Sequence, residues 1–143
     1  MMTMMRGGVF AVMMTAAMAA SSPAGADGAL AVGSTANVVK DGIAVGTSVN
    51  YESANAAVEA ALTRCRGYKP APKAATLCRS VGTFKNECYA VSFDPKEGTP
   101  GAGWAIAPTK ELAEERAMAY CQVTAGEDRR DFCKIEESKC DGN

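Results

Sequence analysis

The chain lacks histidine, and this absence limits the chemistry that its other side chains can perform. Histidine occurs nowhere in the 143 residues, so a Ser-His-Asp triad, a Cys-His pair and a His-bearing zinc site are excluded within this chain. Catalysis would have to use carboxylates, a Ser-Lys pair or a reactive thiol. No motif marks a Ser-Lys dyad, and six cysteines leave no odd thiol to act as a nucleophile. We therefore name no catalytic residue and no metal ligand, and we expect no cofactor.

Two pairs of adjacent glutamates are the obvious candidates for chemistry that uses two carboxylates. Glu114 and Glu115 lie in a helix-like run, and Glu136 and Glu137 lie in a strand-like run. Adjacent residues point in different directions on a helix and to opposite faces of a strand. Neither pair is therefore expected to present two acids to one substrate atom, and both are expected to be solvated.

Basic side chains gather around the segment RGYKPAPKAAT, which separates two cysteines in the middle of the chain. Its prolines favour an extended, exposed loop. Such a loop would suit an anionic partner, such as an acidic protein, phospholipid heads or a cell-wall polymer, or would only balance acidic residues elsewhere. The single tryptophan is a further candidate, either as an interface residue or as part of the core. The candidate binding residues are Arg64, Arg66, Lys69, Lys73 and Trp104, with Arg79 close to the basic group.

Charge is divided unevenly between the two halves of the chain after residue 26. Residues 27–85 carry seven basic and four acidic side chains, and residues 86–143 carry seven basic and twelve acidic ones. The whole chain has a net charge of −1. Because basic residues with interleaved aromatic residues are missing, we expect no nucleic-acid partner.

Residues 1–26 are predicted to be a signal peptide. Arg6 is their only charged residue, and an apolar run of 12 residues, VFAVMMTAAMAA, follows it. This run is too short to cross a membrane, which needs roughly 20 residues. Ala24 and Ala26 supply small side chains for cleavage before Asp27, although a cut after Ala19 also fits. The alternative is a short uncleaved anchor. We expect export to the periplasm or beyond, with no transmembrane segment after cleavage.

An internal repeat divides residues 27–143, predicted to be one domain, into two units, 27–85 and 86–143. Aligning Cys65 with Cys121 brings two alanine-rich helices into register, and each helix follows a good N-cap residue, Ser53 or Thr109. The strand-like runs are ALAV at 29–32, IAVGTSV at 43–49, CRSVGTF at 78–84, CYAVSF at 88–93, GWAIA at 103–107 and CKIEES at 133–138. Each unit has the order strand, strand, helix, strand. The predicted fold is α+β, with one antiparallel sheet and two helices on one of its faces.

The predicted domain is poor in large apolar side chains, so we expect disulfides to stabilise it. Leu, Ile, Val and Phe make up only 19 of the 117 residues from Asp27 onward, and such a thin core is marginal alone. A native disulfide contributes roughly 2 to 5 kcal/mol in a small exported domain. The repeat suggests the pairs Cys65–Cys78 and Cys121–Cys133, which leaves Cys88–Cys140. Six cysteines formally allow 15 pairings. A zinc site of four cysteines is the rival interpretation, although no CxxC pair favours it.

Several segments of the chain together match a known pattern. They are GALAVG, SANAAVEAALTRC, CRSVGTFKNECYAVSF, GAGWAIAPTKELAEERAMAYC and DFCKIEESKC. In these segments the chain resembles, over residues 28–140, a family of exported bacterial proteins called domain of unknown function 4189. The segment RGYKPAPKAAT is longer than the family's pattern. The resemblance implies export and the two-unit layout, and it implies no activity.

The function that these observations favour is that of an exported, disulfide-stabilised, non-enzymatic interaction module, for instance an inhibitor or a binder of an envelope or host component. Its partner would be an unknown protein or an anionic envelope component. A small hydrolase that uses carboxylates or serine is the first alternative and would need an open cleft with converging polar groups and shifted pKa values. A structural envelope protein without a discrete ligand is the second.

Overall fold

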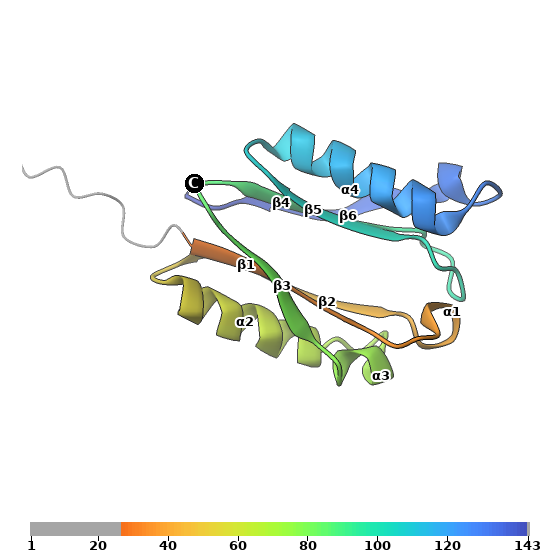
Figure 1. Ribbon diagram of the computed structural model, residues 1–143, viewed down its shortest axis with the longest axis horizontal. Coiled ribbons are helices and arrows are strands. Elements are labelled where there is room, and N and C mark those ends of the chain that lie inside the picture. Colours follow the sequence, from red (N-terminus) through yellow and green to blue (C-terminus); the bar gives the residue numbers. More distant parts are fainter. Residues whose placement is uncertain (1–26, 143) are drawn as a thin grey trace, which may run out of the picture.

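Two three-stranded antiparallel sheets lie face to face, with one long helix on the outer face of each (Figure 1). The computed structural model describes residues 27–142, so the predicted signal peptide, residues 1–26, lies outside the described residues. Both sheets and all three disulfides lie within the described range. No helix in this part of the chain is long and apolar enough to cross a membrane.

The first unit is a sheet of order β2-β1-β3 covered by α2. Its elements are β1 (Asp27–Ser34), α1 (Val38–Asp41), β2 (Ile43–Tyr51), α2 (Ala54–Arg66), α3 (Pro72–Ala75) and β3 (Arg79–Lys85). The predicted N-cap is confirmed, because the Ser53 hydroxyl accepts a hydrogen bond from the Ala56 N–H at 3.1 Å.

The second unit repeats this layout with the order β5-β4-β6, covered by α4. Its elements are β4 (Cys88–Phe93), β5 (Ala102–Ala107), α4 (Lys110–Ala125), the 3-10 helix η1 (Arg130–Phe132) and β6 (Lys134–Cys140). The Thr109 hydroxyl caps α4 by accepting from the Leu112 N–H at 3.2 Å. The α+β class and the strand-strand-helix-strand repeat are therefore confirmed.

The prediction of one sheet with both helices on the same face is wrong. After β3 the chain passes through Asn86 and Glu87 into a second sheet, and β3 and β4 do not pair. The reason lies in the inner faces of the strands, where large apolar side chains of both sheets form one buried cluster around Leu30, Phe84 and Tyr89. A single sheet with helices on one face would leave these side chains in water, whereas stacking the sheets buries them.

The outer face of each sheet carries small residues that let its helix lie very close. A Cβ at Gly46 in β2 would collide with the carbonyl oxygen of Ala61 in α2. A Cβ at Gly103 in β5 would collide in the same way with Ala117 in α4. Alanines fill most of the space between helix and sheet in both units. The scarcity of large apolar residues thus reflects this close approach of the layers.

All three proposed disulfides are confirmed. The S–S distances are 1.92 Å for Cys65–Cys78, 2.02 Å for Cys88–Cys140 and 2.05 Å for Cys121–Cys133. The first and third join a helix to the start of the next strand, and the second joins β4 to β6 between partners in register. Because the six cysteines are all bonded to one another, they do not form a zinc site.

The segment at residues 66–76 is mostly exposed, but it is not the extended loop that its prolines favour. Residues 72–75 form the helix α3, with Pro72 in its first turn. Ala71, Ala74 and Ala75 are buried in the core of the first unit. The prediction failed because the alanines of the segment have an apolar surface to cover, which stabilises a helical turn after the proline.

A buried carboxylate joins the two units at the end of the molecule where β4 begins. Asp141 accepts hydrogen bonds from the N–H of Asn50 at 2.7 Å and of Asn86 at 3.1 Å. Both asparagines adopt positive φ angles, 62° and 52°, in the left-handed region that asparagine tolerates better than most residues. The first belongs to β2 and the second to the connection between the sheets, so Asp141 holds the units together at this end.

Candidate functional site

Three hollows lie along the seam between the two units. The polar groove, of about 540 Å³, lies where β2 faces β6, and the apolar groove, of about 770 Å³, lies where β3 faces β5. The end hollow, of about 610 Å³, lies between α1 and α3 of the first unit and the β4–β5 connection of the second. Tyr68 and Phe93 line both the end hollow and the polar groove, and Ile43 and Pro100 line both the end hollow and the apolar groove. The end hollow is therefore adjacent to both grooves.

A chain of hydrogen bonds crosses the seam in the polar groove. The Tyr89 hydroxyl donates to the Thr47 hydroxyl at 3.0 Å, and the Thr47 hydroxyl donates to a carboxylate oxygen of Glu137 at 3.2 Å. The other oxygen of Glu137 lies 2.8 Å from the Lys139 ammonium. Arg64 donates to the carbonyl oxygen of Thr47. The side chains of Thr47, Glu137 and Lys139 thus bind one another in this groove.

These contacts and the burial of the groove affect the protonation of Glu137 and of two tyrosines. Burial alone would raise the pKa of Glu137, but the hydrogen bond and the charge of Lys139, together with the hydrogen bond from Thr47, lower it, and the pKa lies below its ordinary value of 4.5. Burial raises the pKa of Tyr89 and also that of Tyr68, to which the charge of Glu136 contributes. Glu137 therefore stays ionised and both tyrosines stay neutral at pH 7. A general acid requires a carboxyl with a raised pKa, and the shift at Glu137 has the opposite sign.

Glu136 and Glu137 line the same groove, although adjacent strand residues were expected to point to opposite faces. The register between β4 and β6 shifts at this point, since Val91 pairs with Glu137 whereas Ser92 pairs with Ile135. Glu136 is the extra residue of a β-bulge, which breaks the alternation of side chains. The other pair points in different directions, as expected, because Glu114 accepts a hydrogen bond from Ser138 whereas Glu115 is exposed; Glu114 is part-buried and is not fully solvated as predicted.

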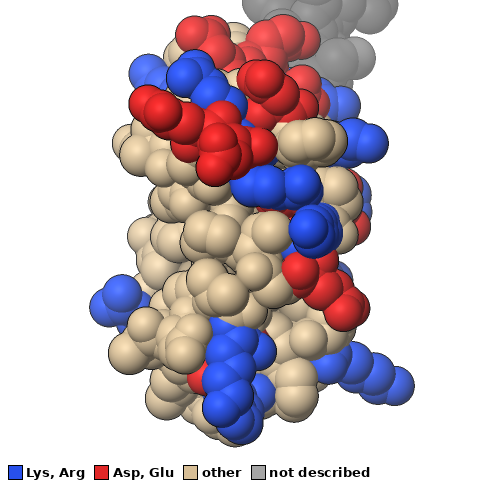
Figure 2. Space-filling model, turned by 90° about the vertical axis from the view of Figure 1, so that its right-hand side faces the viewer, with Lys and Arg blue, Asp and Glu red and all other residues tan. Residues whose placement is uncertain are grey.

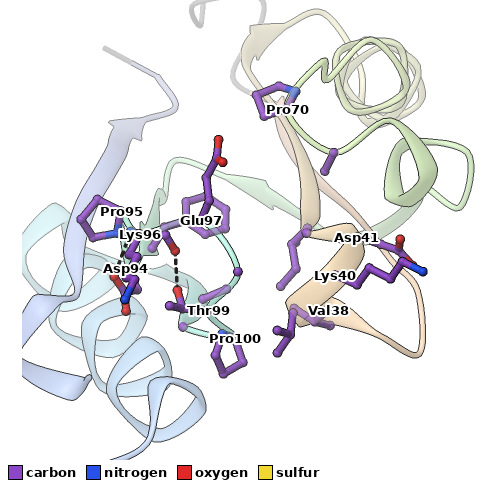
Figure 3. Close-up of a pocket in the computed structure, with 18 of the residues that line it drawn as sticks. Val38, Lys40, Asp41, Pro70, Asp94, Pro95, Lys96, Glu97, Thr99 and Pro100 are labelled. Atoms are coloured by element: carbon purple, nitrogen blue, oxygen red, sulfur yellow. Dashed lines mark hydrogen bonds between the residues drawn. The ribbon is translucent and has the colours of Figure 1, made fainter. Parts of the chain in front are cut away.

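The end hollow opens on the face shown in Figure 2, where acidic side chains gather over the second unit and an uncharged surface lies below them. Figure 3 shows its two walls, with Val38, Asp41 and Pro70 on one side and the loop at 94–101 on the other. Asp41 accepts from the Thr35 hydroxyl at 2.8 Å and lies 3.3 Å from the Lys73 ammonium. The hydrogen bond from Thr35 is the main cause that lowers the pKa of Asp41, and Lys73 adds to it.

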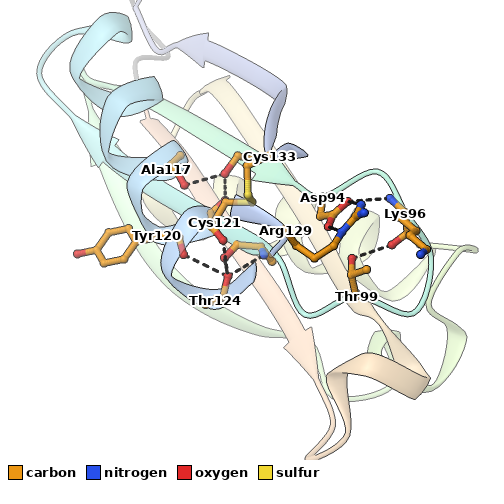
Figure 4. The surroundings of a disulfide bond; sticks show 12 residues. Asp94, Lys96, Thr99, Ala117, Tyr120, Cys121, Thr124, Arg129 and Cys133 are labelled. Atoms are coloured by element: carbon orange, nitrogen blue, oxygen red, sulfur yellow. Dashed lines mark hydrogen bonds and ion pairs between the residues drawn. A yellow bond between two sulfur atoms is a disulfide. The ribbon is translucent and has the colours of Figure 1, made fainter. Parts of the chain in front are cut away.

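An ion pair fixes the opposite wall. Both carboxylate oxygens of Asp94 accept from the guanidinium of Arg129 at 2.7 Å, and one of them also accepts from the Lys96 N–H at 3.0 Å. Arg129 lies over the ring of Phe132 at 4.1 Å, close to the Cys121–Cys133 disulfide (Figure 4). The hydrogen bonds from Arg129 lower the pKa of Asp94 to about 2. The loop is thereby attached to the segment that follows α4.

The residues proposed as binding candidates do not form one patch. Arg64 turns into the polar groove, and Lys73 pairs with Asp41 at the end hollow. Arg66 and Lys69 are exposed, and Lys69 stands between two residues that line the end hollow. Trp104 is half-buried against the cluster between the sheets and lines the apolar groove, on the opposite edge from Arg64.

Sequence reasoning missed the residues that surround Trp104. They include Val81 of β3 and Arg116 and Tyr120 of α4. The alignment of the repeats contained a signal for them, because Tyr120 and Arg64 both precede the cysteine of their helix. That signal has meaning only once the two sheets are known to be stacked.

The comparisons with known proteins identify the family of this chain and no individual relative. No curated protein and no solved structure matches the chain. The model of one family matches residues 27–140, which include every strand and helix described above. The chain therefore belongs to the family described as domain of unknown function (DUF4189).

Proposed function

We propose that this protein is an exported, disulfide-stabilised binding module that holds its ligand in the seam between the two units and does not act on it chemically. The observation that carries the proposal is a set of three neighbouring hollows, each lined by residues of both units, with volumes of about 540 to 770 Å³. Volumes of this size are typical of small-molecule sites. The ligand comes from the cell envelope or from a host.

The walls of the hollow support binding because they are fixed before a ligand arrives. The Asp94–Arg129 pair holds the loop at the end hollow, and the hydrogen bonds of Thr47 hold the polar groove. Two disulfides attach α2 and α4 to their sheets. A preorganised site loses less conformational entropy on binding.

The electrostatics favour binding over hydrolysis. The lowered pKa values of Glu137, Asp41 and Asp94 keep these carboxylates ionised and paired at neutral pH. A carboxylate that already accepts from a lysine or arginine is a poor proton acceptor for a substrate. Export is supported by the predicted signal peptide and by three disulfides, which persist in oxidising compartments.

The test is capture of ligands from envelope and culture fractions with the oxidised chain 27–143. Two variants change residues that line the hollows, Val81→Glu in the apolar groove and Lys73→Glu at the end hollow. Val123→Glu is the matched control, because Val123 is 80 % exposed on α4 and lines none of the three hollows. A ligand retained by the control, lost by a seam variant and recovered chemically unchanged is the expected result. A ligand held equally by all variants, or recovered cleaved, would contradict the proposal.

A further inference from the structure

The polar and apolar grooves occupy equivalent places in the repeat. Gly46 and Gly103 hold the same position beneath the helix in the two units, so the next residues, Thr47 and Trp104, are also equivalent. Thr47 lines the polar groove and Trp104 lines the apolar one. Each groove is formed by the second strand of one unit and the third strand of the other. The two grooves therefore differ in their side chains and not in their architecture.

Within residues 27–142, the side chains that line the apolar groove lack the hydrogen bonds and ion pairs that join Thr47, Glu137 and Lys139 in the polar groove. Its lining consists mainly of apolar residues and contains a single charged side chain, that of Arg116. Arg116 is exposed on α4, and no acidic side chain within residues 27–142 forms an ion pair with it. Alignment of the helix cysteines places Ala60 at the equivalent position in the first unit. The second unit thus has a cation beside an apolar groove where the first has a methyl group.

The lining has the composition of a site for an amphiphile. It combines apolar side chains, among them Leu30, Ile43, Val81 and Trp104, with Tyr120 and the charged Arg116. Tyr120 is 60 % exposed and Val81 38 % exposed, so large apolar surface on both sides of the groove remains in water. An alkyl chain that covers such surface removes it from water, and this burial of apolar surface favours binding.

We propose that the apolar groove binds a single-chain fatty acid, with its alkyl chain against Trp104 and Val81 and its carboxylate on Arg116. This inference rests on the proposed function and names the ligand class of one part of the seam. One unpaired guanidinium matches one monovalent head group, and arginine binds carboxylates through two parallel hydrogen bonds. A volume of about 770 Å³ is within the range for a single small ligand.

The only tryptophan of the chain lies in this groove, so its fluorescence reports occupancy directly. The oxidised chain 27–143, which contains every described element, is titrated with dodecanoate below its micellar concentration. Dodecyltrimethylammonium serves as the probe with the same chain and the opposite charge. We expect a saturable shift of the Trp104 emission with dodecanoate and binding at least tenfold weaker with the cation.

Substitutions at Arg116 and Val81 test separately how the carboxylate and the alkyl chain of dodecanoate contribute to binding. Arg116→Gln should weaken dodecanoate binding about 10- to 100-fold, in line with the loss of a charged hydrogen-bonding partner, whereas Arg66→Gln, at an exposed arginine on α2, should leave it unchanged. Val81→Glu should abolish binding, and Val123→Glu should preserve it. Both valines are exposed on the folded domain, so their substitution is not expected to prevent folding.

Equal affinity for the two probes, or unchanged affinity of Arg116→Gln, would overturn the assignment of the carboxylate to Arg116. The absence of any saturable change at Trp104 would overturn the fatty-acid proposal as a whole. If capture in the seam still depends on Val81 or Lys73 in that case, the proposed function stands and only this inference fails.

Discussion

The pair of Asp94 and Arg129 should make the stability of the protein depend on pH in the acid range. Asp94 is buried, with its side chain 0 % exposed, and that of Arg129 is 26 % exposed. The hydrogen bonds from Arg129 lower the pKa of Asp94 from 3.8 to about 2 in the folded protein. Because the folded pKa lies below the unfolded one, the ionised pair stabilises the fold above pH 4. That stabilisation is lost as the pH falls through 2.

The size of the effect follows from the two pKa values. A pKa difference of this size corresponds to about 2 kcal/mol of stability at neutral pH, since one pKa unit is about 1.4 kcal/mol. We expect the variant Asp94→Asn to be less stable than the wild type at pH 7. The gap in the free energy of unfolding should shrink by about 2 kcal/mol between pH 5 and pH 2. Asp41 and Glu137, whose pKa values are also lowered, titrate in both proteins and cancel from the difference.

Urea unfolding of the oxidised protein at pH 7, 5, 4, 3 and 2 measures this gap. Glu97→Gln is the matched control, because Glu97 is an exposed carboxyl on the same loop, and it should follow the wild type at every pH. If the gap between Asp94→Asn and the wild type stays constant from pH 5 to pH 2, the pair does not have the lowered pKa and the reasoning fails.

Two further predictions concern the contacts that define the layers and join the units. Gly103→Ala should destabilise the protein by about 1 to 3 kcal/mol in urea unfolding, because the new Cβ collides with the backbone of Ala117. Gly82→Ala, whose Cβ meets only the end of a flexible side chain at 2.7 Å, should cost less than half as much, and equal losses would contradict this explanation. Asp141→Ala should cost about 2 to 4 kcal/mol, because it removes the acceptor of two backbone N–H groups. Asp128→Ala, at an exposed position, should change stability by less than about 0.5 kcal/mol, and comparable losses would show that Asp141 does not join the units.

The elements of the fold were predictable because local signals mark them. Ser53 and Thr109 cap the two long helices as their side chains suggested. The cysteines repeat with the helices, and this regularity alone led to the disulfide pairs that the structure contains. Each of these signals acts over a few residues or over one repeat.

The arrangement of the sheets was not predictable in the same way, because it depends on which faces are left uncovered. Leu30 and Val91 alternate with small residues along their strands, and this pattern is equally compatible with one wide sheet or two stacked ones. The bulge at Glu136 likewise has no local signature, and it changed which carboxylates share a groove. Both features follow from pairing between distant segments, and the candidate site depends on them.

The comparison of the two units indicates which positions are free to carry function. Positions in close contact with a helix hold the same residue types in both units, such as Gly46 and Gly103, because a larger side chain would separate the layers. The equivalent positions that face the seam differ, as Thr47 and Trp104 do. Packing does not require that difference, since one framework accommodates both side chains. A repeat that keeps its packing residues while its grooves diverge has a stable framework with two distinct surfaces. We therefore expect ligand binding at the surface whose arginine has no ion-pair partner within residues 27–142.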